Sequence, residues 1–193
     1  MAKGNRTGGR MQSATARRKR VATTSSTRLV GTKKKQRRTS APIELAYRGR
    51  TPSDDAFIVQ LTKEQLGTIH QEAFGEPFPE NQFLRYIQSG APTMMIQRGE
   101  HPIGYYSYLL GEPGKMHVTA LVIDKKHQSV GVGKEVMKKL ERDARAMGVV
   151  VMEVFVQDTN ESSLEFTKGL GFVEAYRIDP HTIAFQKRLT PTL

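Results

Sequence analysis

The sequence contains no cysteine and no tryptophan, and its apolar runs are short. Without cysteine the chain has no disulfide framework, no cysteine-ligated zinc site and no thiol nucleophile, while the redox compartment stays open. The aliphatic stretch at residues 149–152 falls far short of the roughly 20 residues of a membrane span. No apolar core follows the basic start, as a secretory signal requires. We therefore expect a soluble, cytoplasmic protein without a membrane partner.

Acidic residues are nearly absent from the first quarter of the 193-residue chain. Residues 1–50 carry 15 Lys and Arg but a single acid, Glu44, a formal charge of +14, whereas residues 51–193 carry 15 Lys and Arg and 18 acids, a charge of −3. Up to Ser40 the segment is also poor in large apolar residues, so it buries too little surface to offset its ordering entropy. The sequence predicts a disordered basic tail at 1–50 and one folded domain at 51–193.

Two basic clusters, at residues 17–20 and 33–38, indicate what the tail does. A flexible polycation binds nucleic acid without sequence preference by releasing phosphate counterions, so residues 1–40 are a candidate nucleic-acid anchor. Such an anchor would place the protein on the nucleoid. In a eukaryote the two clusters match a bipartite nuclear import signal. A transit peptide and a solubilising tail are the alternative interpretations.

The rest of the chain has the pattern of short strands alternating with helices. Residues 56–60 resemble a strand, and Thr62 with Gln65 three residues later forms a capping-box signal for a helix that runs to about residue 73. The further predicted elements are a helix at 81–88, a hairpin of strands at 93–97 and 103–110, a strand at 116–123, a helix at 133–147, a strand at 149–157 and a short helix that starts at 160–161 and ends at 169–172.

A glycine loop, residues 128–134, joins the strand at 116–123 to an amphipathic helix. Glycines let the backbone approach a ligand closely, and the first-turn amides and helix dipole then point at a phosphate. The loop is neither a P-loop, because Glu135 follows Gly133-Lys134, nor a dinucleotide GxGxxG motif, because residue 136 is Val. The pattern predicts an anion site, with a helix entry that needs glycine only for packing as the alternative.

Downstream residues extend this pattern. Gln128, Gly131 and Gly133 are followed by the long helix, a strand, Asn160, a short helix and the turn at 170–172. In this order and spacing the sequence resembles the GNAT superfamily of N-acetyltransferases over residues 56–188. The resemblance implies an α/β fold of three α+β layers, in which helices flank a mixed, mostly antiparallel central sheet.

The resemblance also implies acetyl-coenzyme A as co-substrate. The loop amides would hold its pyrophosphate, the strand end would pair with its pantetheine arm, and the backbone amide of Leu121 would polarise the thioester carbonyl. Asn160 would bond the same arm as well as cap its helix, and Lys134 would either touch a phosphate or stay solvated. The residues expected at the cofactor are Leu121, Val122, Ile123, Gln128, Ser129, Val130, Gly131, Val132, Gly133, Lys134, Asn160 and Ser163.

For catalysis, an amine must attack the thioester and lose a proton. Relatives often carry a glutamate eleven residues before the loop glutamine, where this chain has His117. Imidazole titrates near neutral pH, which suits a general base. His117 is therefore the candidate base, with a structural strand histidine as the alternative. Glu72 is the alternative base, together with Glu76, Glu80 and Glu153.

One position departs from the family pattern. The usual general acid is a tyrosine seven residues after the asparagine, and here that residue is Thr167, which has no phenol. Water, or one of Tyr105, Tyr106 and Tyr108, would then serve, or no acid at all. The histidines form no metal-ligand spacing, so we expect no metal.

The acceptor of the acetyl group is the least defined part of the prediction. The folded domain is mildly acidic, which favours a cationic acceptor, and a nucleic-acid anchor would concentrate the enzyme near basic proteins. The sequence therefore predicts an N-acetyltransferase that modifies an amine on a protein. The alternatives are a nucleic-acid-associated binding protein with weakened catalysis and an acetyltransferase for small amines.

Overall fold

The computed structural model describes residues 44–190, apart from the side chain of Asp179. The predictions made for residues 1–43, the nucleic-acid anchor among them, lie outside the described residues. The elements are β1 (Ala46–Gly49), α1 (Asp55–Phe74), α2 (Glu80–Gln88), β2 (Thr93–Arg98), β3 (His101–Leu110), β4 (Lys115–Ile123), α3 (Val132–Ala146), β5 (Val151–Gln157), α4 (Glu161–Gly169), β6 (Val173–Asp179) and β7 (Thr182–Arg188). None of these helices is long and apolar enough to cross a membrane.

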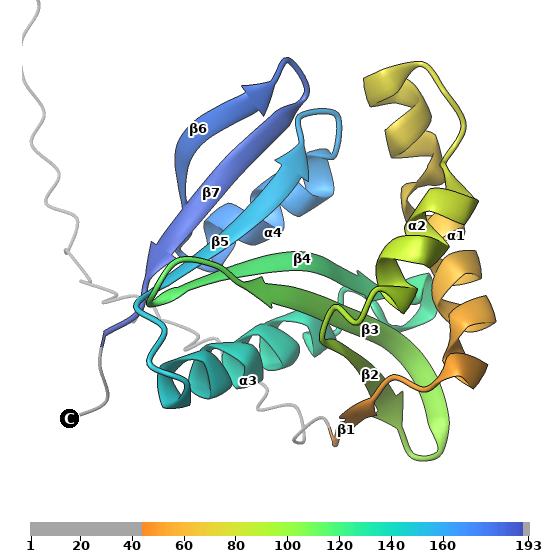
Figure 1. Cartoon of the computed structure of the whole chain (residues 1–193), viewed down its shortest axis with the longest axis horizontal. Coiled ribbons are helices and arrows are strands. Elements are labelled where there is room, and N and C mark those ends of the chain that lie inside the picture. Colours follow the sequence, from red (N-terminus) through yellow and green to blue (C-terminus); the bar gives the residue numbers. More distant parts are fainter. Residues whose placement is uncertain (1–43, 191–193) are drawn as a thin grey trace, which may run out of the picture. The chain divides into compact units, whose positions relative to one another are not determined.

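The strands form one seven-stranded sheet in the order β1-β2-β3-β4-β5-β7-β6. Every neighbouring pair is antiparallel except β4 and β5, which run parallel. The connection between these two strands is α3, as a parallel pair requires a crossover. The predicted mixed, mostly antiparallel sheet is confirmed (Figure 1).

Two apolar clusters cover the two faces of the sheet. Ile58, Leu61 and Ile87 of α1 and α2 pack with Met95, Tyr105 and Val122 on one face. On the other face, α3 buries its amphipathic side against the sheet, and side chains of α4 pack at the edge of the same cluster. The result is the three-layer arrangement expected from the sequence, with α1 and α2 on one side and α3 and α4 on the other.

The strand predicted at residues 56–60 is wrong, because these residues belong to α1. A short apolar run does not distinguish a strand from a buried helix segment, and Ile58, Leu61 and Thr62 share the inner face of one helix. Thr62 is not a cap either. Its hydroxyl donates to the carbonyl of Ile58, one turn earlier, at 2.7 Å. The helix begins instead after a 3-10 turn, Pro52–Asp54.

The folded domain starts before residue 51, the boundary expected from charge. β1 pairs with β2 in the register Ala46↔Gln97 to Gly49↔Met94. Arg48 forms a bidentate ion pair with Asp54, at 2.7 and 2.8 Å, and the Arg48 hydrogen bond holds the pKa of that carboxyl far below its usual range. Arg50 pairs with Asp55 at 2.6 Å. Two arginines counted with the basic tail therefore anchor the first strand to α1.

Candidate active site

The central parallel pair of strands separates after four residue pairs. β4 and β5 are aligned from Lys115↔Val151 to Val118↔Val154, and beyond this point β5 pairs only with β7. Figure 1 shows the two strands diverging towards the carboxyl end of β4. Among residues 44–190, no strand pairs with the facing edges from Thr119 and Phe155 onward, so their backbone groups need hydrogen bonds from something else. Leu121, Val122 and Ile123 lie on this open edge.

A β-bulge marks the place where the separation begins. Tyr108 of β3 pairs with Val118, but the residue before it, Ser107, pairs with Ala120 and not with Thr119. Thr119 is the extra residue on β4. A bulge bends and twists its strand and leaves one residue outside the ladder, which re-aims local backbone groups.

The glycine loop lies just beyond the end of β4. Gly131 has φ 95° and caps α3, and Ser129, although not a glycine, also has a positive φ, at 61°. The first intrahelical bond runs from Glu135 N–H to Gly131, so the amides of Val132, Gly133 and Lys134 have no partner within the helix. Val130 is 60% exposed. The loop thus presents backbone donors at a helix start, the arrangement expected of an anion site.

Two loop residues have structural contacts that the sequence did not predict. The Gln128 side chain donates to the Ile123 carbonyl at 2.7 Å and to Gln65 of α1 at 3.1 Å, so it ties the loop to the strand end. A Cβ on Gly133 would lie 3.0 Å from Cζ of Phe166 in α4. A side chain at residue 133 would therefore press on Phe166, so a substitution there would also affect packing.

Asn160 and Ser163 lie at the start of α4. The Asn160 side chain is 5% exposed and accepts from the amide of Ser163 at 3.1 Å, a helix N-cap. The capping alternative is therefore observed for Asn160, while Ser163 uses its backbone amide in this contact. Lys134 is exposed on the first turn of α3.

His117 lies on β4 opposite Glu153 of β5. Its Nδ1 is 2.8 Å from Oε1 of Glu153, although that oxygen has no partner in hydrogen-bond geometry. The imidazole also stacks on Phe155 at 6.1 Å between ring centroids. Its other nitrogen, Nε2, faces Gly111, where a Cβ would approach to 2.6 Å. The imidazole is thus held from two sides, and its charge when protonated is balanced by the carboxylate.

Glu153 is fully buried and belongs to a polar cluster. Its Oε2 lies 3.1 Å from Lys115 Nζ and accepts from Gln186 at 2.6 Å and from Tyr176 at 3.1 Å. Burial opposes ionisation, but these hydrogen bonds and the Lys115 charge outweigh it and hold the pKa of Glu153 below its usual value. Glu153 is therefore a stable anion that lies against His117.

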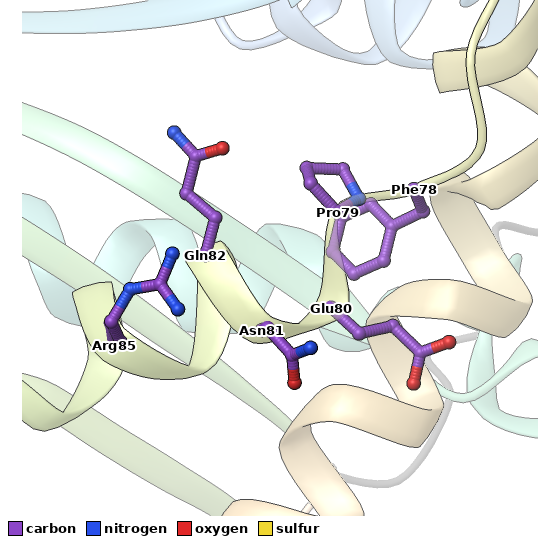
Figure 2. A pocket seen from close by; sticks show the side chains of 6 residues that line it. All are labelled: Phe78, Pro79, Glu80, Asn81, Gln82 and Arg85. Atoms are coloured by element: carbon purple, nitrogen blue, oxygen red, sulfur yellow. The ribbon is translucent and has the colours of Figure 1, made fainter.

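The other carboxylates considered as bases lie elsewhere. Glu72 is exposed on α1, Glu76 is 3.9 Å from His70, and Glu80 pairs with Lys63 at 2.7 Å. Glu80 also borders an open pocket of about 570 Å³ at the start of α2 (Figure 2), lined by Phe78, Pro79, Glu80, Asn81, Gln82 and Arg85. Within residues 44–190, no three metal-ligating side chains gather at one point.

A family model describing the acetyltransferase (GNAT) family matches residues 63–172 of this chain. The chain belongs to this family. The match spans the open edge of β4, the glycine loop, the His117–Glu153 contact and the start of α4, the features just described.

Solved structures with the same fold include several acetyltransferases. One from Thermus thermophilus has 21% identity over 75% of this chain and 97% of its own, with a TM-score of 0.62. The PaiA N-acetyltransferase of Thermoplasma acidophilum, solved with coenzyme A, has 14% identity over 75% of this chain and 99% of its own, with a TM-score of 0.63. The ribosomal-protein-S18-alanine N-acetyltransferase of Escherichia coli has 14% identity over 77% of this chain and 96% of its own, with a TM-score of 0.56. At these identities the likeness is one of fold.

In this GNAT fold, two of the tyrosines considered as general acids, Tyr105 and Tyr106, are buried. Thr167 is 6% exposed in α4. Tyr105 is buried against Thr62, and burial raises its pKa strongly; burial, with the nearby charges of Asp143 and Tyr108, raises the pKa of Tyr106 to about 12. A phenol that does bond a residue of the bulge is that of Tyr86 in α2, whose hydroxyl donates to Thr119 at 2.8 Å. Sequence reasoning missed Tyr86 because only the packing of α2 on the sheet brings it to β4.

Proposed function

We propose that this chain is an acetyl-coenzyme-A-dependent N-acetyltransferase that transfers an acetyl group by direct attack of an amine on the thioester. The observation that supports this proposal best is the open edge of β4, which has a bulge and lies next to the glycine loop. The edge offers unpaired backbone groups to an extended arm, and the loop offers amides to the phosphates at the end of that arm. A ligand with both parts, of which acetyl-coenzyme A is one, fits this pair of sites.

Each part of the binding site has residues suited to it. The amides from Ser129 to Lys134 would hold the pyrophosphate, with the positive φ angles of Ser129 and Gly131 turning the backbone towards it. Leu121, Val122 and Ile123 would bond the pantetheine arm, and Asn160, which follows β5 and caps α4, would bond the same arm. Acetyl-coenzyme A supplies an activated acyl group when it is bound.

The reaction itself then requires positioning, a base and charge stabilisation. His117 accepts the proton of the attacking amine, and the ionised carboxylate of Glu153 stabilises the imidazolium that forms. The amide of Leu121 stabilises the developing oxyanion. Glu72 is the second candidate in this scheme, because it is exposed on α1, whereas His117 lies on β4 itself.

We further propose that the acceptor amine belongs to a protein. Residues 51–193 carry a formal charge of −3, which favours a cationic acceptor. The fold is also that of an enzyme whose acceptor is an alanine of a ribosomal protein. The basic residues 1–40 would then hold the enzyme close to nucleic acid and to the basic proteins bound there.

The test of cofactor binding is a calorimetric titration with acetyl-coenzyme A. The informative variant is Val130→Glu, because Gly133→Ala would also disturb the packing on Phe166. Val130 is 60% exposed in the loop, and Val150, 48% exposed before β5, provides a matched control. A new negative charge near a pyrophosphate costs about 1–2 kcal/mol, so we expect binding to weaken about tenfold in Val130→Glu and to stay unchanged in Val150→Glu.

The acceptor is tested with three probes: a lysine-free peptide with a free α-amino group, an amino-blocked peptide with one lysine, and spermidine. Turnover of either peptide above spermidine supports a protein acceptor. Preference for spermidine would contradict it. Binding of acetyl-coenzyme A without turnover of any amine would favour the alternative of a GNAT-fold binding protein with weakened catalysis.

A further inference from the structure

Three hydroxyl groups from three elements meet at the β4 bulge. Tyr86 of α2 donates to Thr119 Oγ1 at 2.8 Å, and Ser107 Oγ of β3 lies 2.8 Å from the same oxygen. Ser107 is fully buried, whereas Thr119 is exposed. Thr119 is also the first residue of β4 beyond the last pair with β5. The exposed member of the cluster therefore lies where the gap between the strands begins.

Counting donors and acceptors fixes the direction of these bonds. A hydroxyl group has one hydrogen to donate and two lone pairs. In the described part of the chain, Thr119 is the side-chain partner of Ser107 Oγ, so this buried hydroxyl must donate to Thr119 or leave its hydrogen unpaired. With Tyr86 and Ser107 both donating, the lone pairs of Thr119 are filled. Its own hydrogen is then free to point outward into the gap.

We propose that the Thr119 hydroxyl is a preorganised hydrogen-bond donor to the leaving sulfur, and that Tyr86 positions it and replenishes its proton. The inference rests on the proposed function. The amine nitrogen bonds the carbonyl carbon, the carbon–sulfur bond breaks with its electron pair on sulfur, and the Thr119 proton moves to sulfur. The Tyr86 proton moves to Thr119, and water, which reaches the half-buried phenol, restores it to Tyr86. The amine proton leaves through His117, so the products are an amide and a thiol.

The remaining tyrosines near this strand are engaged elsewhere. The Tyr105 hydroxyl bonds Thr62 at 2.6 Å inside the α1 layer, and Tyr106 and Tyr108 pack in the α3 layer. Tyr105 and Thr62 thus form a second tyrosine–threonine pair of nearly the same geometry, away from the gap. This pair provides a control, because it makes the same kind of hydrogen bond but lies in the buried α1 layer and not at the gap.

The kinetic test compares Thr119→Val and Tyr86→Phe with Tyr105→Phe. We expect the first two to lower kcat with acetyl-coenzyme A about 10- to 100-fold and the double variant to lose little more, since the two groups act as one. Tyr105→Phe should keep kcat within about twofold. With S-phenyl thioacetate, whose thiolate needs no proton to leave, the losses in Thr119→Val and Tyr86→Phe should nearly disappear. Equal losses with both acyl donors, or no loss with acetyl-coenzyme A, would overturn the proposal.

An equilibrium measurement gives a readout that does not depend on turnover. A donor to sulfur stabilises the thiolate, so the thiol of bound coenzyme A should ionise at lower pH in the wild type than in Thr119→Val, followed by thiolate ultraviolet absorbance. Identical titrations in both proteins would refute the contact. A wild type that turns over none of the three amines would overturn the proposed function and this inference together, whereas wild-type turnover with an unaffected Thr119→Val would overturn this inference alone.

Discussion

Gly111→Ala should displace the candidate base without altering any titrating group. A Cβ at this position would lie 2.6 Å from Nε2 and 2.9 Å from Cδ2 of His117. Gly111 does not have positive φ, so alanine fits its backbone, and the atoms in the way belong to the tip of a side chain that can turn aside. The fold should therefore persist while the imidazole moves.

The size of the effect follows from the distances. Ordinary carbon–nitrogen contacts are about 3.5 Å, so Nε2 must retreat by roughly 1 Å. Misplacement of a reacting group by about 1 Å can cost on the order of 10²-fold in rate. We therefore expect kcat to fall by about that factor in Gly111→Ala, with little change in the affinity for coenzyme A.

The assay measures kcat with acetyl-coenzyme A in four variants. Gly67→Ala is the control, because its new Cβ lies 3.8 Å from the Lys63 side chain in α1 and should leave kcat unchanged. Adding Gly111→Ala to His117→Ala should cost nothing further, since both changes remove the same group. Full activity of Gly111→Ala beside an inactive His117→Ala would refute the reasoning, as would additive losses in the double variant.

Two further predictions concern the polar cluster and the tail. Glu153→Gln should lower the free energy of unfolding at pH 7 by about 2 kcal/mol, less than for a fully buried pair because Lys115 and His117 reach solvent. Because the folded pKa of Glu153 is depressed, this stabilisation is complete above about pH 5 and disappears as the pH falls through the folded value. Urea unfolding of both proteins at pH 7 and pH 3 checks this, and a difference that is constant with pH would contradict it. Deleting residues 1–43, which keeps β1, should abolish salt-dependent DNA binding in a filter assay but leave turnover of the free peptide probes intact; unchanged DNA binding would exclude the tail as the anchor.

The glycine loop and the elements after it were predictable from the sequence because their signals are local. Glycines at 131 and 133, an amphipathic helix and an asparagine before a short helix each specify backbone geometry within a few residues. The hairpin at β2 and β3 was predictable for the same reason. The helical conformation of residues 56–60 was not predictable, since a five-residue apolar run is too short to show the periodicity that separates a strand from a helix.

Contacts between distant residues were outside the reach of sequence reasoning. Glu153 was predicted as a weak candidate base, whereas the parallel register of β4 and β5 places it beside His117 as a buried anion. Tyr86 was not predicted at all, because the packing of α2 on the sheet brings it to Thr119. The charge count misplaced Arg48 and Arg50, whose partners Asp54 and Asp55 lie on the other side of the expected boundary.

The sheet consists of two hydrogen-bonded halves, here called plates, which are joined only by the short β4–β5 ladder within the described residues. β1 to β4 form one hydrogen-bonded plate and β5 to β7 the other, and four residue pairs connect them. A small rotation about this seam widens or narrows the gap without breaking a hydrogen bond inside either plate. The Glu153 cluster bridges the same seam, with Lys115 and His117 on one plate and Gln186 and Tyr176 on the other. The ionic contacts beside the candidate base therefore also join the two halves of the sheet, and any change in the width of the gap would have to strain them.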